Sequence, residues 1–432
     1  MFLNTLGGGK GRGCLFCGNF IFLKKLPSVQ KYEKIRKVPW NDGTDMERRN
    51  RMRKGSGLGI FLLVFMLALL LPRPAFAATG TQAVKLGKNV SGALTETYPE
   101  RRYTFTLPRS GRVALHATFA TERVNYRLYT PSGDLVFRKE GVQRDEATGK
   151  SRIDETIDLQ GGTYTLCVDS KYLLVQKYYG KFVFRINYKA AAETFAETNK
   201  AEKEDISSAN AVSFGQTIRA QMSANEDRDI FRFRLSAAGR VSLRAKAQVK
   251  YLWYNLYDAN GKEIWTKHAV WNSGIGTSYV EENLDLLPGT YYFAAAKDRS
   301  TGNYAFRLAF RKVAVSFTET AGKNNDTLET ATKISVGKTV RGFLALTNEK
   351  DFYRFKVASG KEVRVQAAAY MKYISYKIIN SRGETVWSSQ PNWGSASGKS
   401  RIDEKVKLSK GTYFFIAQRV GTNTGRYLFC VG

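Results

Sequence analysis

Few side chains in this sequence could act as acids, bases or nucleophiles, and they are widely separated. The chain has two histidines, His116 and His268, which lie far apart. Neither a zinc triad nor a Ser-His-Asp set can therefore be built around neighbouring histidines. The adjacent carboxylates Asp154-Glu155, repeated at Asp403-Glu404, would point to opposite faces of a strand rather than into one cleft. We predict that the chain is not an enzyme.

A repeated segment organises the chain. The tripeptide Gly-Thr-Tyr occurs at residues 162–164, 289–291 and 411–413, and the pentapeptide Ser-Arg-Ile-Asp-Glu occurs at 151–155 and 400–404. Self-similarity at a regular spacing is typical of tandem modules, and copies of about 115–125 residues have a normal domain size. We expect three modules, at residues 78–190, 191–313 and 314–432.

The pattern within each copy predicts the fold class. Apolar residues alternate with polar ones, as in Tyr103-x-Phe105-x-Leu107, which is typical of a strand with one buried face. Dipeptides such as Asn260-Gly261 are typical of hairpin turns, and helical periodicity is nearly absent. We predict an all-β fold of three tandem antiparallel β-sandwich modules that match strand for strand. Residues expected at equivalent places are Gly87, Gly215 and Gly337 in turns, and Tyr164, Tyr291, Tyr413, Phe184, Phe306 and Phe429 in the core.

Three tryptophans are the candidates for ligand contact. Trp265 and Trp387 occupy a position that is aromatic in every copy, so we expect them in the core. Trp271 and Trp393 lie in the variable loop before the next strand, and Trp253 stands where another copy has serine. An exposed indole offers a flat surface on which a sugar ring can stack. We predict that Trp253, Trp271 and Trp393 are ligand-binding residues.

Residues 46–77 have the features of a secretory signal peptide. A basic segment ending at Lys54 precedes an apolar run from Gly57 to Leu71, and Ala75-Phe76-Ala77 is an A-x-A cleavage site. The run is short for a bilayer span, which needs about 20 residues. We expect cleavage after Ala77, which would leave no integral membrane domain; an uncleaved anchor with a short basic cytoplasmic tail is the alternative. Residues 1–45 are expected to be a mis-assigned start or a disordered extension.

The charge balance indicates the kind of partner. The full chain carries a formal net charge of +30, and removing the leader, with fourteen basic and four acidic residues, leaves about +20. A positive field of this size attracts anionic partners. Export would separate the chain from nucleic acid, so we expect no nucleic-acid partner; cell-wall polymers, acidic polysaccharide and anionic lipid headgroups remain. The alternative is that the charge only keeps a secreted protein soluble.

The third copy resembles the bacterial pre-peptidase C-terminal (PPC) domain family. It has an acidic Asn/Asp-rich segment at 324–326, an Ala-x-x-Ile-x-x-Gly opening from Ala331, an acidic residue before an aromatic strand at Asp351-Phe352-Tyr353, and the Gly-Thr-Tyr strand at 411–413. Only the order of these short motifs is specific. The resemblance implies a jelly-roll-like β-sandwich in each copy. Members of the family are usually non-catalytic appendages of secreted proteases or surface proteins, and no protease domain accompanies these repeats.

The resemblance also implies a calcium site in the third copy. Calcium takes six to eight oxygen ligands, and the residues at the positions that calcium-binding relatives use are Glu319, Asn324, Asn325, Asp326 and Asp351. The alternative is that these Asn and Asp residues form turns and caps. Calcium is therefore a possible cofactor of the third module.

Together these observations predict a secreted or cell-surface, non-catalytic binding protein. The expected partner is an anionic polysaccharide or cell-wall polymer. Two alternatives are a structural spacer in a surface assembly and an accessory module that docks on a separately encoded secreted protease.

Overall fold

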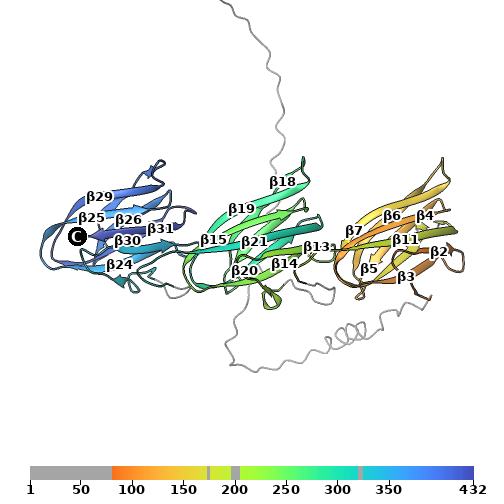
Figure 1. Ribbon diagram of the computed structural model, residues 1–432, viewed down its shortest axis with the longest axis horizontal. Coiled ribbons are helices and arrows are strands. Elements are labelled where there is room, and N and C mark those ends of the chain that lie inside the picture. The colour runs from red at the N-terminus through yellow and green to blue at the C-terminus, as the bar shows by residue number, and fades with distance from the viewer. Residues whose placement is uncertain (1–79, 173–175, 196–204, 320–324) are drawn as a thin grey trace, which may run out of the picture. The chain divides into compact units, whose positions relative to one another are not determined.

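The computed structural model describes residues 80–172, 176–195, 205–319 and 325–432, and these residues form an all-β structure (Figure 1). The fold class predicted from the sequence is therefore confirmed. Helix in the described residues is limited to one 3-10 turn, Ile206–Ser208, before the second module. Four expected features lie outside the described residues: the extension at 1–45, the signal at 46–77, its cleavage residues Ala75 and Ala77, and Asn324.

The second module consists of two five-stranded sheets. The strand order is β12-β14-β20-β16-β17 in its first sheet and β13-β21-β15-β19-β18 in its second sheet. All pairs are antiparallel except that of the short β12 with β14. The strands are β12 (Asn210–Ala211), β13 (Thr217–Met222), β14 (Arg228–Leu235), β15 (Gly239–Ala247), β16 (Leu252–Tyr257), β17 (Glu263–His268), β18 (Val270–Asn272), β19 (Thr277–Leu286), β20 (Gly289–Lys297) and β21 (Gly302–Lys312).

The third module repeats this topology. Its first sheet has the order β22-β24-β30-β26-β27 and its second sheet the order β23-β31-β25-β29-β28. The strands are β22 (Thr332–Lys333), β23 (Val340–Leu344), β24 (Lys350–Val357), β25 (Lys361–Ala369), β26 (Ile374–Asn380), β27 (Thr385–Ser389), β28 (Trp393–Gly394), β29 (Lys399–Leu408), β30 (Gly411–Arg419) and β31 (Gly425–Val431).

The first module differs at one corner. Its strands form one continuous sheet, β1-β3-β8-β5-β6-β7-β4-β11-β2, because β6 pairs with β5 up to Gln143 and with β7 at Arg144 and Asp145. The equivalent segment is divided into β17 and β18 in the second module, at the buried Ala269. The expected strand-for-strand match therefore holds for the second and third modules but is wrong at this corner of the first. Its strands are β1 (Gln82–Ala83), β2 (Asn89–Leu94), β3 (Glu100–Leu107), β4 (Gly111–Phe119), β5 (Arg123–Tyr129), β6 (Leu135–Asp145), β7 (Lys150–Leu159), β8 (Gly162–Asp169) and β11 (Gly180–Ala190), with β9 (Lys171–Tyr172) and β10 (Gln176–Lys177) as a separate pair.

Aromatic side chains join the two facing β-layers of each module into one core; in the first module these layers are parts of one continuous sheet. In the second module, Phe231 and Phe293 of the first sheet contact Phe306 of the second sheet, with ring centroids 4.9 and 4.7 Å apart. Aromatic pairs at such distances stabilise a core beyond the area they bury. The predicted burial is confirmed for every residue named above: Tyr164, Tyr291, Tyr413, Phe184, Phe306 and Phe429.

The repeated glycine before the second strand of each copy closes a turn that needs a left-handed backbone. Gly87, Gly215 and Gly337 have φ values of 74°, 83° and 82°. Each donates its N–H to a carbonyl of the module's last long strand, at 2.7–2.8 Å. A residue with a Cβ is strained in this conformation. The three glycines thus occupy equivalent places, as predicted.

A buried aspartate forms hydrogen bonds at each joint between modules. At the first joint, Asp158 accepts two hydrogen bonds from Arg112, at 2.9 and 3.0 Å, and one from the hydroxyl of Thr301 in the next module, at 3.1 Å. Bidentate Arg–carboxylate pairs are among the stronger polar contacts in proteins. The second joint repeats these contacts with Asp285, Arg240 and Thr424.

We predict that Tyr413→Ala will destabilise the third module by about 3–5 kcal/mol, the range for truncating a large core side chain. Tyr413 is 7% exposed, and its hydroxyl donates to the Ser409 carbonyl at 3.1 Å. Denaturant unfolding of the chain from Ala78 onward provides the measurement. Tyr373→Ala is the matched control, because Tyr373 is 50% exposed, and its cost should stay within about 0.5 kcal/mol. Equal costs for the two variants would contradict the assigned burial.

Candidate functional site

A row of outward-facing residues crosses the second sheet of the second module. Arg219 on β13 lies opposite Ala305 on β21, Ala305 lies opposite Lys246 on β15, and Lys246 lies opposite Tyr279 on β19. Arg307 lies two residues from Ala305 on the same face, since side chains alternate along a strand. We call Arg219, Lys246, Tyr279, Ala305 and Arg307 the module-2 groove.

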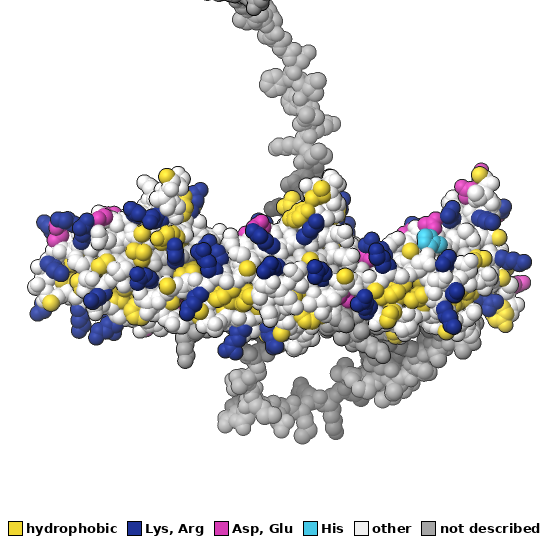
Figure 2. All heavy atoms as spheres, in the orientation of Figure 1, with side chains coloured by type: hydrophobic (Ala, Val, Ile, Leu, Met, Phe, Trp, Pro, Cys, Tyr) yellow, Lys and Arg dark blue, Asp and Glu magenta, His cyan; other side chains and the backbone are white. Residues whose placement is uncertain are grey.

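The cations of the module-2 groove are exposed and available for a ligand. Arg219, Lys246 and Arg307 are all exposed, and none forms an ion pair within the described residues. The neighbouring Arg244 differs, because its guanidinium contacts Glu281 at 2.9 Å. Figure 2 shows basic side chains spread over the face in view, with acidic side chains at few places. Within the described residues, the three cations of the groove therefore have no carboxylate partner; Glu281, which also lines the second depression, is paired with Arg244.

The groove is hollowed where its central residue is small. Two shallow depressions, of about 250 and 280 Å³, share Lys246 and Ala305 in their lining. Tyr279 borders the second depression and is 42% exposed. Its ring lies 5.5 Å from the Lys246 ammonium, a distance at which a cation and a ring attract each other. Cations, a small floor residue and an aromatic ring thus lie together on one open face.

The other two modules carry different residues at these positions. Where the second module has Ala305, the first has Val183 and the third has Leu428, and both are larger. The first module has a depression of about 280 Å³ at this place, but two of its basic side chains there, His116 and Arg152, both contact Asp154, at 2.7 and 2.8 Å. The combination of free cations and a small floor is therefore particular to the second module.

The structure does not bring the three candidate tryptophans together. Trp253 lies on β16 in the first sheet of its module, is 43% exposed and contacts the ring of His268, with centroids 4.7 Å apart. Trp271 and Trp393 lie in second sheets, on β18 and β28, and both are half-buried. They occupy equivalent places, opposite Ser278 and Ser400. Trp253 is the most exposed of the three.

Four of the five residues expected to bind calcium are described, and a fifth polar residue joins them. Asp351 is completely buried, and the side-chain amide of Asn348 donates to Asp351 Oδ1 at 2.7 Å and to Glu319 Oε2 at 3.0 Å. Asn325 donates to the Phe352 carbonyl at 3.1 Å, and Asp326 lies half-buried beside it. We call Glu319, Asn325, Asp326, Asn348 and Asp351 the acidic cluster. Sequence reasoning missed Asn348, which aligns with a glutamate, Glu226, in the second module.

In the acidic cluster, burial and the repulsion between carboxylates favour the protonated, uncharged forms of Glu319 and Asp351. Burial, with repulsion from Asp351 and Asp326, raises the pKa of Glu319 to about 9. Burial also raises the pKa of Asp351 to about 7, although Tyr427 and Asn348 donate hydrogen bonds to it. Neither Glu319 nor Asp351 forms an ion pair in the described part of the chain. The Oδ1 atoms of Asn325 and Asn348 are buried there without a hydrogen-bond partner. Unsatisfied oxygens and uncompensated carboxyl groups fit a hard cation such as calcium.

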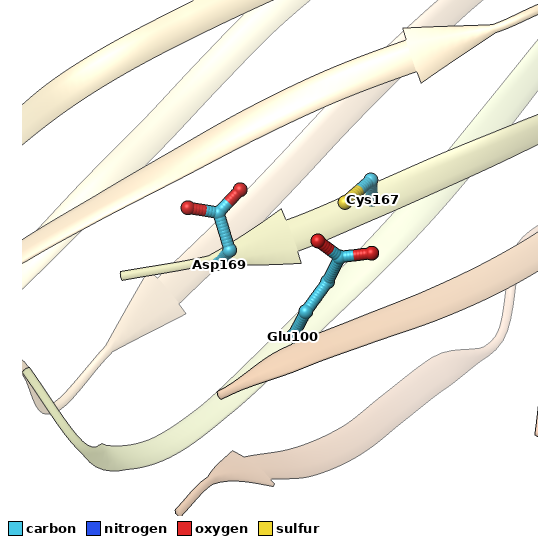
Figure 3. A group of neighbouring side chains, drawn as sticks. All are labelled: Glu100, Cys167 and Asp169. Carbon is cyan, nitrogen blue, oxygen red and sulfur yellow. The ribbon is translucent and has the colours of Figure 1, made fainter. Parts of the chain in front are cut away.

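A second cluster, in the first module, is suited to a structural role. Glu100, Cys167 and Asp169 place one potential ligand atom each within 4.8 Å of one another (Figure 3). Both carboxylates are compensated, since Arg102 contacts Glu100 at 2.6 Å and Arg127 contacts Asp169 at 3.1 Å. Burial raises the pKa of Cys167 to about 12, so its sulfur is a thiol rather than the thiolate that binds metals.

The carboxylate pairs considered for catalysis contact different partners. Asp403 accepts two hydrogen bonds from Arg364, whereas Glu404 accepts one from the Trp387 indole at 2.9 Å and one from Ser389 at 2.8 Å. Adjacent strand residues point in opposite directions, so each pair is divided between two surroundings. The absence of enzymatic activity stays a prediction.

Comparison with known proteins gives distant likenesses. No family model matches the sequence. The chain is similar to the solved pre-peptidase C-terminal domain of collagenase from Bacillus anthracis, at 21% identity over 24% of this chain and 94% of that domain, with a TM-score of 0.22. It is also similar to the CUB1-EGF-CUB2 region of human MASP-1/3, at 9% identity over 50% of this chain and 99% of that one, with a TM-score of 0.17. Among the described residues, no helix combines the length and apolar content that a membrane span requires.

We predict that Cys167 in the native chain will resist alkylation by iodoacetamide at pH 8. Its side chain is 1% exposed and its pKa is raised to about 12, so little thiolate forms and little reagent reaches it. Mass spectrometry of the chain from Ala78 onward, treated folded and in denaturant, checks this. Cys430, which is half-buried and also free, serves as the internal comparison. Equal labelling of Cys167 in both states would show that its strand opens readily.

Proposed function

We propose that this chain is a non-catalytic binding protein of the cell surface or extracellular space, and that it holds anionic polymers, above all acidic polysaccharides. We infer that its three modules are PPC-like, on the order of motifs in the third copy and the matching topology of the second and third modules. The signal peptide expected at 46–77 supports placement outside the cell.

The uneven pairing of charges carries the proposal. Many acidic side chains of the described residues contact a basic neighbour, as Glu281 contacts Arg244 and Glu362 contacts Lys405. The excess of Lys and Arg leaves exposed cations such as Arg219, Lys246 and Arg307 without such a partner in the described structure. Free surface cations attract polyanions, and the attraction falls with ionic strength.

We predict that the chain from Ala78 onward will bind polygalacturonate but not the fully methyl-esterified polymer, which has the same backbone without its charge. Affinity should fall steeply between about 0.1 M and about 1 M salt, over which the Debye length shrinks from about 10 to about 3 Å. Biolayer interferometry on the immobilised polymers supplies the measurement. Binding to neither polymer would favour a structural spacer, and equal binding to both would exclude a charge-based function.

We further propose that the acidic cluster binds calcium. The observation that favours it is the set of buried oxygens in which Asn325 Oδ1 and Asn348 Oδ1 have no hydrogen-bond partner among the described residues. A calcium ion would compensate the carboxylates of Glu319 and Asp351 and stabilise the folded third module. Asp326 is a further ligand candidate.

Calcium should therefore stabilise the chain more at pH 8 than at pH 5. The folded-state pKa values of Asp351, about 7, and Glu319, about 9, lie above the ordinary values of 3.8 and 4.5. Without metal, the folded state thus holds more protons than the unfolded state, and stability falls as pH rises from about 4 towards about 9. At pH 8 the ion replaces the missing protons, whereas at pH 5 it must displace them.

Thermal scans with calcium and with chelator, at both pH values, check this expectation. Asp351→Asn should abolish the calcium-induced shift and weaken the pH dependence in chelator. Asp403→Asn is the matched control, because Asp403 is exposed and bonded to Arg364, and it should retain the shift. A calcium shift that survives in Asp351→Asn would place the ion elsewhere.

A further inference from the structure

We propose that the module-2 groove binds a single strand of a carboxylate-bearing polysaccharide. Arg219, Lys246 and Arg307 contact the carboxylates, and Tyr279 lies against a sugar ring. This inference rests on the proposed polymer-binding function and assigns it a place and a ligand chemistry.

The width of the groove suits one extended polymer strand. Arg219 and Lys246 lie on strands separated by β21, with Ala305 between them. Because neighbouring strands lie about 4.8 Å apart, their Cα atoms are roughly 10 Å apart. The Ala305 methyl group leaves the space between the two cations open, and both adjoining depressions include it. An extended sugar chain fits between two cations at this separation.

The charged groups match carboxylates on a flexible chain. An arginine side chain offers a planar fork that can bind a carboxylate through two parallel hydrogen bonds. Arg219 and Arg307 are exposed and lie on neighbouring strands, with Arg307 opposite Thr217 on β13. Lys246 adds a point charge beside Tyr279. A polymer with a carboxylate on each sugar can therefore contact several of these cations at once, and it can do so in more than one position along the groove.

The aromatic content of the groove favours sugar over single-stranded nucleic acid. Tyr279 is the one aromatic among the five groove residues, and it is 42% exposed. Proteins that bind single-stranded nucleic acid stack successive bases on several aromatic side chains along a basic path. One open tyrosine ring between cations instead suits the apolar face of one sugar in a charged chain.

The third module shows which residue could replace Ala305 at the floor of the groove without changing the charges. The third module has Leu428 in place of Ala305 and Ala368 in place of Lys246. Its sheet therefore lacks both the open floor and the central cation. Ala305→Leu transfers the third module's floor to the second module, fills the groove and leaves every charge in place.

The test measures binding of polygalacturonate by three variants of the chain from Ala78 onward. Arg219→Gln with Lys246→Gln should weaken affinity about tenfold, since surface ion pairs each contribute modestly. Ala305→Leu should weaken it severalfold with an unchanged salt dependence. The matched control is Arg232→Gln with Arg234→Gln, which removes the same charge from exposed positions on β14 in the other sheet; it should retain most of the affinity. Circular dichroism and melting temperature confirm that each variant folds.

The outcomes distinguish the site from the general function. Equal losses for the groove pair and the β14 pair, or full affinity in Ala305→Leu, would overturn the groove as the site while leaving polyanion binding in place. No binding of polygalacturonate by the unaltered chain would remove both proposals. Single-stranded oligonucleotide that binds more tightly than polygalacturonate, and is lost in the groove pair, would identify nucleic acid as the occupant and overturn the polysaccharide assignment.

Discussion

The structure depends on one constraint, which is that each module must bury the inner faces of two β-layers against each other. Phe306 illustrates it, because its ring closes the space between the sheets against Phe231 and Phe293. A strand exposes alternate residues, so the same constraint that fixes the inner positions leaves the outer ones free. The core is therefore similar in the three modules, while the outer faces differ.

The outer faces are where the modules acquire different chemistry. On the second sheet, the sequence of residues across the strands is Arg219, Ala305, Lys246 and Tyr279 in the second module. In the first module, Arg152 and His116 of the corresponding surface contact Asp154. Substitution at such positions costs little stability because no core contact is lost. One module of a repeat can in this way differ from its neighbours in surface chemistry while its core packing is kept.

Buried charge in this chain is handled in two ways. At the joints, Asp158 and Asp285 are each matched by a bidentate arginine, so their burial is compensated. In the acidic cluster, Asp351 is equally buried but has amide and hydroxyl donors in place of a cation. The raised pKa of Asp351 expresses that difference. A buried carboxylate that is paired with an arginine stabilises the joint between modules. A buried carboxylate without a cation favours binding of a proton or a metal ion.

The sequence by itself determined the fold class, the turn glycines and the buried aromatics, because these follow from local periodicity and from backbone conformations that glycine alone adopts easily. The resemblance of the third copy to the PPC family also pointed to four members of the acidic cluster, Glu319, Asn325, Asp326 and Asp351. The sequence could not give the module-2 groove, whose members lie on four strands distant in sequence and meet only through strand pairing. The sequence likewise could not predict that β17 and β18 are two strands whereas the equivalent β6 is one. That difference depends on whether the end of the segment pairs with β7, as it does in the first module. Local rules act through neighbours in the chain; the site is decided by register between strands, which only the tertiary structure sets.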